Sequence, residues 1–139
     1  MAVTIRATAI TGGRARGQVL FTDQPISFWG GLDMRTGDMV DPRHPLFGQP
    51  ASGRVLAFPQ GKGSCTAPLV LLELMRIQKA PAALVLTRTD PILATAPIVA
   101  GRLYGWTLPI VNVSPADFAL LATNPMAVVD GDAGRLTIE

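Results

Sequence analysis

The sequence predicts a single, turn-rich domain of mixed α/β class. A chain of 139 residues that is 48% hydrophobic and only 16% charged has enough apolar material for one compact core, and its length is typical of one domain. The 14 glycines and 12 prolines are spread along the whole chain. This distribution indicates tight turns between short elements, because a disordered tail or a collagen-like repeat would concentrate these residues or space them regularly.

Strands are expected first. Residues 3–10 alternate in strand fashion, a glycine-containing turn follows, and residues 18–22 form a second strand-like run. Residues 23–49 then indicate a long loop that holds aromatic residues, glycines and the only histidine. Loops of this length in compact domains are usually functional or disordered, and the aromatic content and polar variety favour function.

Strands and helices alternate after the loop. Buried strands are expected at 54–59, 82–87 and 108–113. Helices are expected at 67–79, at 91–104 and at 115–122. Asp90 with Pro91, and Ser114 with Pro115, form the capping pairs that begin the second and third of these helices. A hairpin over 127–139 closes the chain.

Charge and hydropathy exclude several classes of partner. The longest apolar stretches, 67–75 and 91–100, are much shorter than the roughly 20 residues that cross a bilayer, so no membrane segment is expected. The N-terminus places Arg6 inside a strand-like pattern and does not resemble a signal peptide, which predicts a cytoplasmic location. The formal charge is only +2 and the arginines are scattered, which disfavours nucleic-acid binding.

The glycine-rich turn Gly61-Lys62-Gly63-Ser64 is the most informative candidate site. Glycines at a strand-to-helix junction let backbone N–H groups point at a ligand, and the helix dipole favours negative charge there. This geometry suits a carboxylate or a phosphate. The spacing differs from that of a nucleotide-binding P-loop, because a glycine follows the lysine. The alternative is a plain glycine turn in which Ser64 or Thr66 caps the helix.

Ser64 is also a candidate base. A free hydroxyl is too weak a base unless N–H donors, a helix N-terminus and a cation such as Lys62 stabilise its oxyanion, and this turn provides all three. A serine hydrolase is disfavoured, because Gly63-Ser64-Cys65 lacks the G-x-S-x-G spacing and His44 is the only available partner base.

Cys65 and His44 each allow a structural or a chemical role. One thiolate cannot hold an iron–sulfur cluster, which needs about four protein ligands, so no metal ligand is expected from this chain and metal chemistry would require a partner. Cys65 is predicted to be a small buried packing residue, with a nucleophile or ligand as the alternative. His44 is either a catalytic or orienting group or a structural hydrogen-bonder.

The segment Ser27-Phe28-Trp29-Gly30-Gly31 places two aromatic side chains beside a flexible diglycine. Such a segment suits closure over a ligand or docking onto a partner surface. The alternative is that both rings fill the core.

Several stretches together resemble the small subunit, or swivel domain, of aconitase X. In chain order they are PISFWGGLD, HPLFGQ, GRVLAFPQGKGSCT, LLELMRIQKAPAALVL and IVAGRLYGWTLPIV. The resemblance covers nearly the whole chain and implies that residues 1–139 form one swivelling β/β/α domain. Within the wider aconitase superfamily, GKGSCT resembles the G-x-G-S-S-R turn, whose first serine is the catalytic base; this assigns the base to Ser64.

The resemblance also implies a substrate contact for the rest of this turn, namely Gly61, Lys62, Gly63, Cys65 and Thr66. Two positions depart from the superfamily pattern. Cys65 replaces the usual second serine, and Thr66 replaces the substrate-binding arginine of aconitase proper. The second departure disfavours a tricarboxylate substrate and is expected for the X branch.

The resemblance further implies a large partner subunit, whose cysteines hold an iron–sulfur cluster and whose iron acts as Lewis acid on the departing hydroxyl. The substrate would be a small carboxylate. Members of the X branch resemble dehydratases of cis-3-hydroxy-L-proline in bacteria and of phosphomevalonate in archaea. A composition rich in Ala, Arg and Gly and poor in Lys, Ile and Glu favours the bacterial reaction, with phosphomevalonate as the alternative.

Two other classes of function are alternatives. The run TAPIVAGRLYGWTLPIV is similar to the phosphohistidine domain of phosphoenolpyruvate-utilising enzymes, but the phosphorylated position falls on Thr95. A non-catalytic scaffold that binds a partner through Phe28 and Trp29 is the other alternative.

Overall fold

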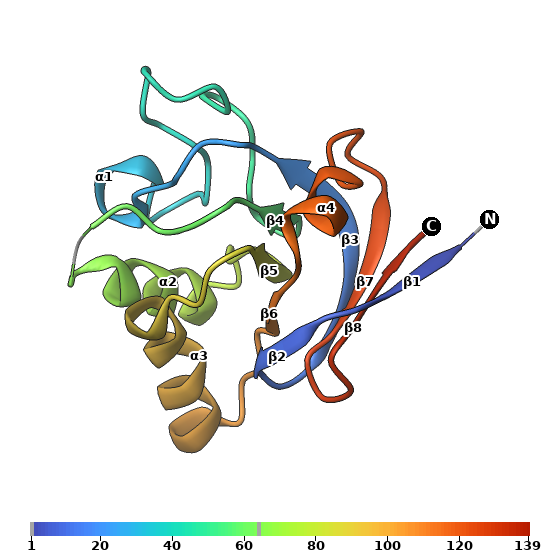
Figure 1. Ribbon diagram of the computed structural model, residues 1–139. Coiled ribbons are helices and arrows are strands. Elements are labelled where there is room, and N and C mark those ends of the chain that lie inside the picture. Colours follow the sequence, from blue (N-terminus) through green and yellow to red (C-terminus); the bar gives the residue numbers. More distant parts are fainter. Residues whose placement is uncertain (1, 64) are drawn as a thin grey trace.

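The computed structural model describes residues 2–63 and 65–139, and Met1 and Ser64 lie outside the described residues. Its strands are β1 (Val3–Arg6), β2 (Thr8–Thr11), β3 (Arg14–Phe21), β4 (Val55–Ala57), β5 (Ala83–Leu86), β6 (Ile110–Asn112), β7 (Met126–Asp130) and β8 (Arg135–Ile138). Its helices are α1 (Phe28–Gly31), α2 (Ala67–Arg76), α3 (Pro91–Tyr104) and α4 (Pro115–Ala119). The mixed α/β class is therefore confirmed (Figure 1).

The sheet curls toward a barrel because its two edge strands are neighbours in the sequence. The strand order is β1-β8-β7-β3-β4-β5-β6-β2, yet only Ala7 separates β1 from β2. One residue spans at most about 3.6 Å, so the two edges of the sheet must lie close together. The Ala7 N–H donates to the Gly134 carbonyl at 2.9 Å at this crossing. The expectation of one strand over residues 3–10 was wrong, because the chain changes pairing partner at Ala7.

Strands β3, β4, β5 and β6 pair in parallel, and the two central ones are buried on both faces. Leu56 and Leu84 face one hydrophobic core, which also contains side chains of α2 and α3. Val55 and Val85 face a second core, which they share with β7 and β8. Successive residues of a strand point to opposite faces, so continuous apolar runs are what a doubly covered parallel strand requires.

Helices α2 and α3 lie side by side on the face of the sheet away from the β7–β8 hairpin (Figure 1). Each forms the crossover between two parallel strands, α2 between β4 and β5, and α3 between β5 and β6. The Asp90 carboxylate caps α3 by accepting from the Leu93 N–H at 3.0 Å, and Gly105 ends the helix with a φ of 71°. The predicted start and end of this helix are therefore confirmed.

The last helix and the last two strands lie close to where the sequence predicts them. The hydroxyl of Ser114 caps α4 by accepting from the Asp117 N–H at 3.2 Å. The regular helix ends at Ala119, earlier than predicted, because the next residues form turns in which Leu121 bonds to the Phe118 carbonyl. Strands β7 and β8 form the expected hairpin.

The long segment between β3 and β4 is ordered by its own backbone contacts. It holds the short helix α1 and two isolated bridges, Leu32 with Met39 and Asp38 with Pro50. Backbone at Gly37 has a φ of +76°, and a Cβ there would overlap the Lys79 carbonyl, so only glycine fits. Across residues 2–63 and 65–139, no helix is both long and apolar enough to cross a membrane.

A buried threonine completes the pairing at the irregular edge between β2 and β6. The Thr11 hydroxyl donates to the Leu108 carbonyl at 2.7 Å and accepts from the Ile110 N–H at 2.8 Å, where the register shifts. Thr11→Val keeps the shape but leaves both backbone groups buried without this partner. We expect a loss of roughly 1–3 kcal/mol in the free energy of unfolding, measured by urea denaturation.

Thr8→Val on the same strand is the matched control for this substitution, because Thr8 is exposed. It should change the free energy of unfolding by no more than about 0.5 kcal/mol. Equal losses for the two variants would contradict the role assigned to Thr11.

Candidate functional site

Backbone hydrogen bonds join the two segments that the sequence singled out. Ile26 and Gly61 form a parallel bridge. The Ile26 N–H donates to the Gln60 carbonyl at 3.3 Å, and the Lys62 N–H donates to the Ile26 carbonyl at 3.0 Å. The segment at 27–31 therefore lies beside the glycine-rich turn at 61–66, although the two are far apart in sequence.

A third segment, the β5–α3 loop, completes the site. The Pro59 carbonyl accepts from the Thr87 N–H, the Thr87 hydroxyl and the Arg88 N–H at 3.2, 3.1 and 3.3 Å. The Asp90 carboxylate lies against Gly61 so closely that a Cβ on Gly61 would overlap its Oδ2 atom. A larger residue at position 61 would therefore displace the Asp90 carboxylate, whereas a Cβ on Gly63 would meet open space.

Two cavities flank the glycine-rich turn, and Lys62 and Gly63 line both of them. The first has a volume of about 390 Å³, and Phe28, Gly61 and Asp90 also line it. The second has a volume of about 590 Å³. Its lining includes five further residues that the sequence singled out, Ser27, Trp29, Gly30, Gly31 and His44. The structure therefore gathers most of the predicted residues around one turn.

Three residues of the turn need separate comment. Ser64, the predicted base, lies outside the described residues. Cys65 is exposed, so the prediction that it is a buried packing residue was wrong. Thr66 occupies the N-cap position of α2. Neither Cys65 nor Thr66 lines either of these cavities.

The N-terminus of α2 offers fewer N–H groups to a ligand than the sequence suggested. The Lys62 N–H is taken by the Ile26 carbonyl, and the Leu69 N–H by the Thr66 carbonyl at 3.0 Å. Pro68 stands in the first turn of the helix and has no N–H. The Lys62 side chain, which lines both cavities, is a further group that can recognise an anion here.

The aromatic pair in the long loop is divided between the core and the surface. Phe28 is 1% exposed, and its ring centroid lies 5.8 Å from that of Phe58, so this ring belongs to the core. Trp29 is 55% exposed. The Ser27 hydroxyl donates to the Trp29 carbonyl at 2.9 Å, and Gly30 turns the chain with a φ of 82°. Of the two rings, Trp29 is the one exposed at the surface, whereas Phe28 lines the first cavity from the core.

His44 is a structural hydrogen-bonder at the wall of the second cavity. Its Nδ1 accepts from the Leu46 N–H at 3.1 Å, so the proton lies on Nε2, which donates to the Pro25 carbonyl at 3.2 Å. The neighbouring Asp41 accepts from the Arg43 N–H at 3.0 Å, which lowers the pKa of that carboxyl below its ordinary value. Both ring nitrogens of His44 are thus engaged in holding the loop.

Sequence reasoning missed the β5–α3 loop as part of the site. Asp90 was identified only as a helix cap, because its contact with Gly61 joins residues that are distant in the chain. The amide of Asn112 donates to the Thr89 hydroxyl at 2.6 Å and fixes this loop to β6. The one available signal was the position of the loop at the carboxyl end of a parallel strand, where ligands of open α/β sheets usually bind.

The donor set of the described residues does not fit a metal cluster. Within the described ranges, no three His, Cys, Asp or Glu side chains gather closely enough to hold a metal ion. The single cysteine, Cys65, provides one thiolate. Ligation of an iron–sulfur cluster needs about four such ligands.

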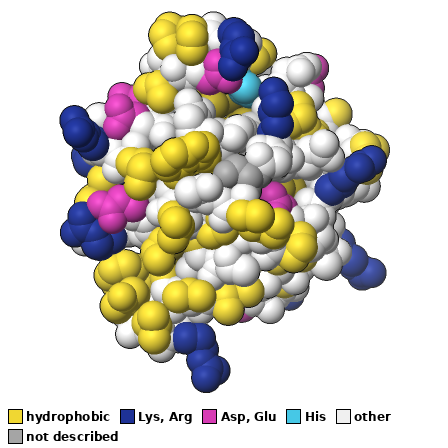
Figure 2. Space-filling model, turned by 90° about the vertical axis from the view of Figure 1, so that its left-hand side faces the viewer, with side chains coloured by type: hydrophobic (Ala, Val, Ile, Leu, Met, Phe, Trp, Pro, Cys, Tyr) yellow, Lys and Arg dark blue, Asp and Glu magenta, His cyan; other side chains and the backbone are white. Residues whose placement is uncertain are grey.

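The exposed face around the turn is partly apolar. Figure 2 shows hydrophobic side chains distributed across this face among scattered charged ones. Its large exposed hydrophobic residues include Trp29 in α1, Leu69 in α2 and Ile92 in α3, at 55%, 60% and 47% exposure. Such a surface around a polar turn is typical of a site that a partner covers.

The sequence is similar to those of two groups of dehydratases. Cis-3-hydroxy-L-proline dehydratase of Pseudomonas aeruginosa is 45% identical over 88% of this chain and 21% of that protein. The chain spans about a fifth of the length of the dehydratases of this name that it matches. Phosphomevalonate dehydratase small subunit of Methanothermobacter thermautotrophicus is 38% identical over 91% of this chain and 93% of that subunit.

The fold has a close counterpart among solved structures. The crystal structure of Thermococcus kodakaraensis aconitase X in its holo-form superposes with a TM-score of 0.87 and 32% identity, over 99% of this chain and 98% of that one. The predicted swivel-domain fold is thereby confirmed. A model of the aconitase X swivel domain matches residues 4–138. The chain therefore belongs to the aconitase X swivel-domain family.

Proposed function

We propose that this chain is the small subunit of a heteromeric dehydratase that converts cis-3-hydroxy-L-proline to pyrroline-2-carboxylate. The observation that carries the proposal is the convergence of the predicted site residues on the turn at 61–66, between two cavities. The dehydratase of this name from Pseudomonas aeruginosa, at 45% identity, supports the choice of substrate.

The reaction removes one molecule of water from the ring. The C2–H bond breaks and its proton passes to a Ser64 alkoxide, while the C3–O bond breaks and the hydroxyl departs as hydroxide. The hydroxide then takes this proton from Ser64 and leaves as water, which restores the alkoxide. The electron pair of the C2–H bond forms the C2=C3 double bond. The resulting enamine then tautomerises to pyrroline-2-carboxylate without a further reactant.

Lys62 is the group that prepares this site for an anion. It is exposed and lines both cavities, two residues before Ser64 in the sequence. An ammonium group there favours the substrate carboxylate and lowers the free energy of an alkoxide on the base. Its charge adds to that of Arg88, which lines the first cavity, and of Arg43, which lines the second.

The partner in this proposal is the large subunit, and it holds the iron–sulfur cluster that the resemblance implies. Several relatives are named as small subunits. The donor set of the described residues does not fit a cluster. The partner would also cover the exposed apolar side chains around the turn, including Trp29.

Phosphomevalonate is the alternative substrate. It is favoured by the match in length, because this chain covers 93% of the archaeal small subunit but about a fifth of the bacterial dehydratase. Anaerobic coexpression with the large subunit, followed by assays of both substrates, decides between the two. Turnover of phosphomevalonate alone would replace the proposed substrate, and turnover of neither would overturn the dehydratase.

The other classes of function have weaker support. A phosphohistidine carrier requires a histidine where this chain has Thr95, an exposed residue of α3 whose hydroxyl donates to the Ile92 carbonyl. Transfer of label from phosphoenolpyruvate to the chain would favour that class. A scaffold would bind the large subunit but would not require Ser64.

Ser64→Ala should lower kcat of the complex by about 10²–10⁴-fold, because the base for the C2 proton is removed. Assembly with the large subunit should be unchanged, as measured by size-exclusion chromatography. Ser52→Ala, which lies in a turn before β4, is the control and should retain full turnover. Unchanged turnover in Ser64→Ala would favour the scaffold.

Trp29→Ala should weaken association with the large subunit by about tenfold or more, because a large exposed ring is removed from the proposed contact face. The dissociation constant can be measured by analytical ultracentrifugation or interferometry. Leu120→Ala is the matched control, since Leu120 is 52% exposed and follows α4, away from both cavities. Equal affinities for the two variants would refute this contact.

A further inference from the structure

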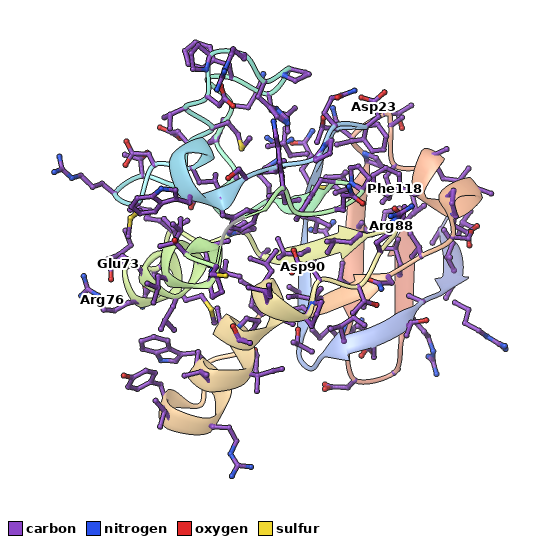
Figure 3. All side chains as sticks on the ribbon, turned by 60° about the vertical axis from the view of Figure 1, so that its left-hand side comes forward. Asp23, Glu73, Arg76, Arg88, Asp90 and Phe118 are labelled. Atoms are coloured by element: carbon purple, nitrogen blue, oxygen red, sulfur yellow. The ribbon has the colours of Figure 1, made fainter. Side chains whose placement is uncertain are left out.

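The first cavity contains a carboxylate that the proposed proton transfer does not use. Asp90 accepts from the Leu93 N–H through Oδ1 at 3.0 Å, and its Oδ2 lies over Gly61. Asp90 is partly buried and lines the same cavity as Lys62. Figure 3 shows it at the start of α3.

Capping a helix does not by itself require this negative charge. Serine, asparagine and aspartate cap helices about equally well. In the same chain, α4 is capped by the Ser114 hydroxyl. The second oxygen of Asp90 thus brings an anion to the cavity that the helix does not need.

The cavity presents charges of both signs to a ligand. Lys62, Arg88 and Asp90 are the charged residues of its lining. A carboxylate therefore stands beside two cationic residues in this lining.

The carboxylate among these charges suits an amino acid, which carries a cation, better than a phosphorylated acid, which carries none. The carboxylate and the ring ammonium of cis-3-hydroxy-L-proline are both attached to the carbon that loses its proton. Their partners must therefore lie close together, and Lys62 and Asp90 line the same cavity, with Asp90 against the neighbouring Gly61. Phosphomevalonate carries a phosphate and a carboxylate but no cation, so Asp90 would repel it.

We propose that Asp90 is a specificity residue that accepts a hydrogen bond from the ring ammonium of a cyclic amino-acid substrate, while Lys62 receives its carboxylate. This inference rests on the proposed dehydratase function, and it explains why that enzyme would select a substrate with an ammonium group. The β5–α3 loop is held for this task by the bonds from Thr87 and Arg88 to the Pro59 carbonyl and by the Asn112–Thr89 bond.

The test compares two ligands that differ in one group. L-Proline carries the ring ammonium, whereas tetrahydrofuran-2-carboxylate has an ether oxygen in its place and the same ring size. Binding of each to the anaerobic complex of both subunits is measured by isothermal titration calorimetry. We expect the wild-type complex to bind L-proline about tenfold or more tightly than the ether analogue.

Asp90→Asn should abolish this preference while keeping the helix cap. The amide oxygen still accepts from the Leu93 N–H, so the Tm and the assembly of the complex should not change. The KM for cis-3-hydroxy-L-proline should rise about tenfold or more. Asp23→Asn is the matched control, because Asp23 is an exposed carboxylate outside the first cavity. Asp90→Ser serves as a second variant if the amide disturbs Gly61.

The outcomes separate this inference from the function on which it rests. A preference for L-proline that persists in Asp90→Asn, or that is absent from the wild-type complex, overturns the role of Asp90. Turnover of phosphomevalonate without turnover of hydroxyproline also overturns it, but leaves the dehydratase in place. Absence of turnover on both substrates overturns the dehydratase itself, while the calorimetric comparison still decides whether Asp90 binds an ammonium group.

Discussion

Burial of the central parallel strands on both faces is the constraint on which the rest of the structure depends. Because β4 and β5 are covered by α2 and α3 on one side and by the β7–β8 hairpin on the other, their side chains divide the molecule into two cores. A parallel strand in this position needs a crossover helix to return the chain. The helices, and the loops that lead into them, are therefore placed by the same requirement.

The site follows from where those crossovers begin. The loops after β4 and β5 leave the sheet side by side, and the Pro59 carbonyl and the Asp90 carboxylate hold them together. Ile26, from the segment after the parallel strand β3, joins the same edge through its bridge to Gly61. Three segments that follow the carboxyl ends of the parallel strands β3, β4 and β5 thus contribute to the walls of the two cavities.

Charged residues of both signs line the two cavities at this end of the sheet. Lys62, Arg88 and Asp90 line the first cavity, and Lys62, Asp41 and Arg43 line the second. The surrounding surface is partly apolar. In the function proposed above, this chain brings a base and a few orienting charges to the surface of a second subunit. The exposed apolar residues around the turn, including Trp29, suit that arrangement better than an isolated enzyme.

The sequence by itself determined the mixed fold and the helix caps at Asp90 and Ser114. These depend on local chemistry, since periodicity, proline and glycine act over a few residues. Only the tertiary structure decided that the first strand-like run divides at Ala7, that Cys65 is exposed and that Asp90 meets Gly61. Each of these depends on contacts between distant segments, which sheet closure and packing create and no local pattern encodes.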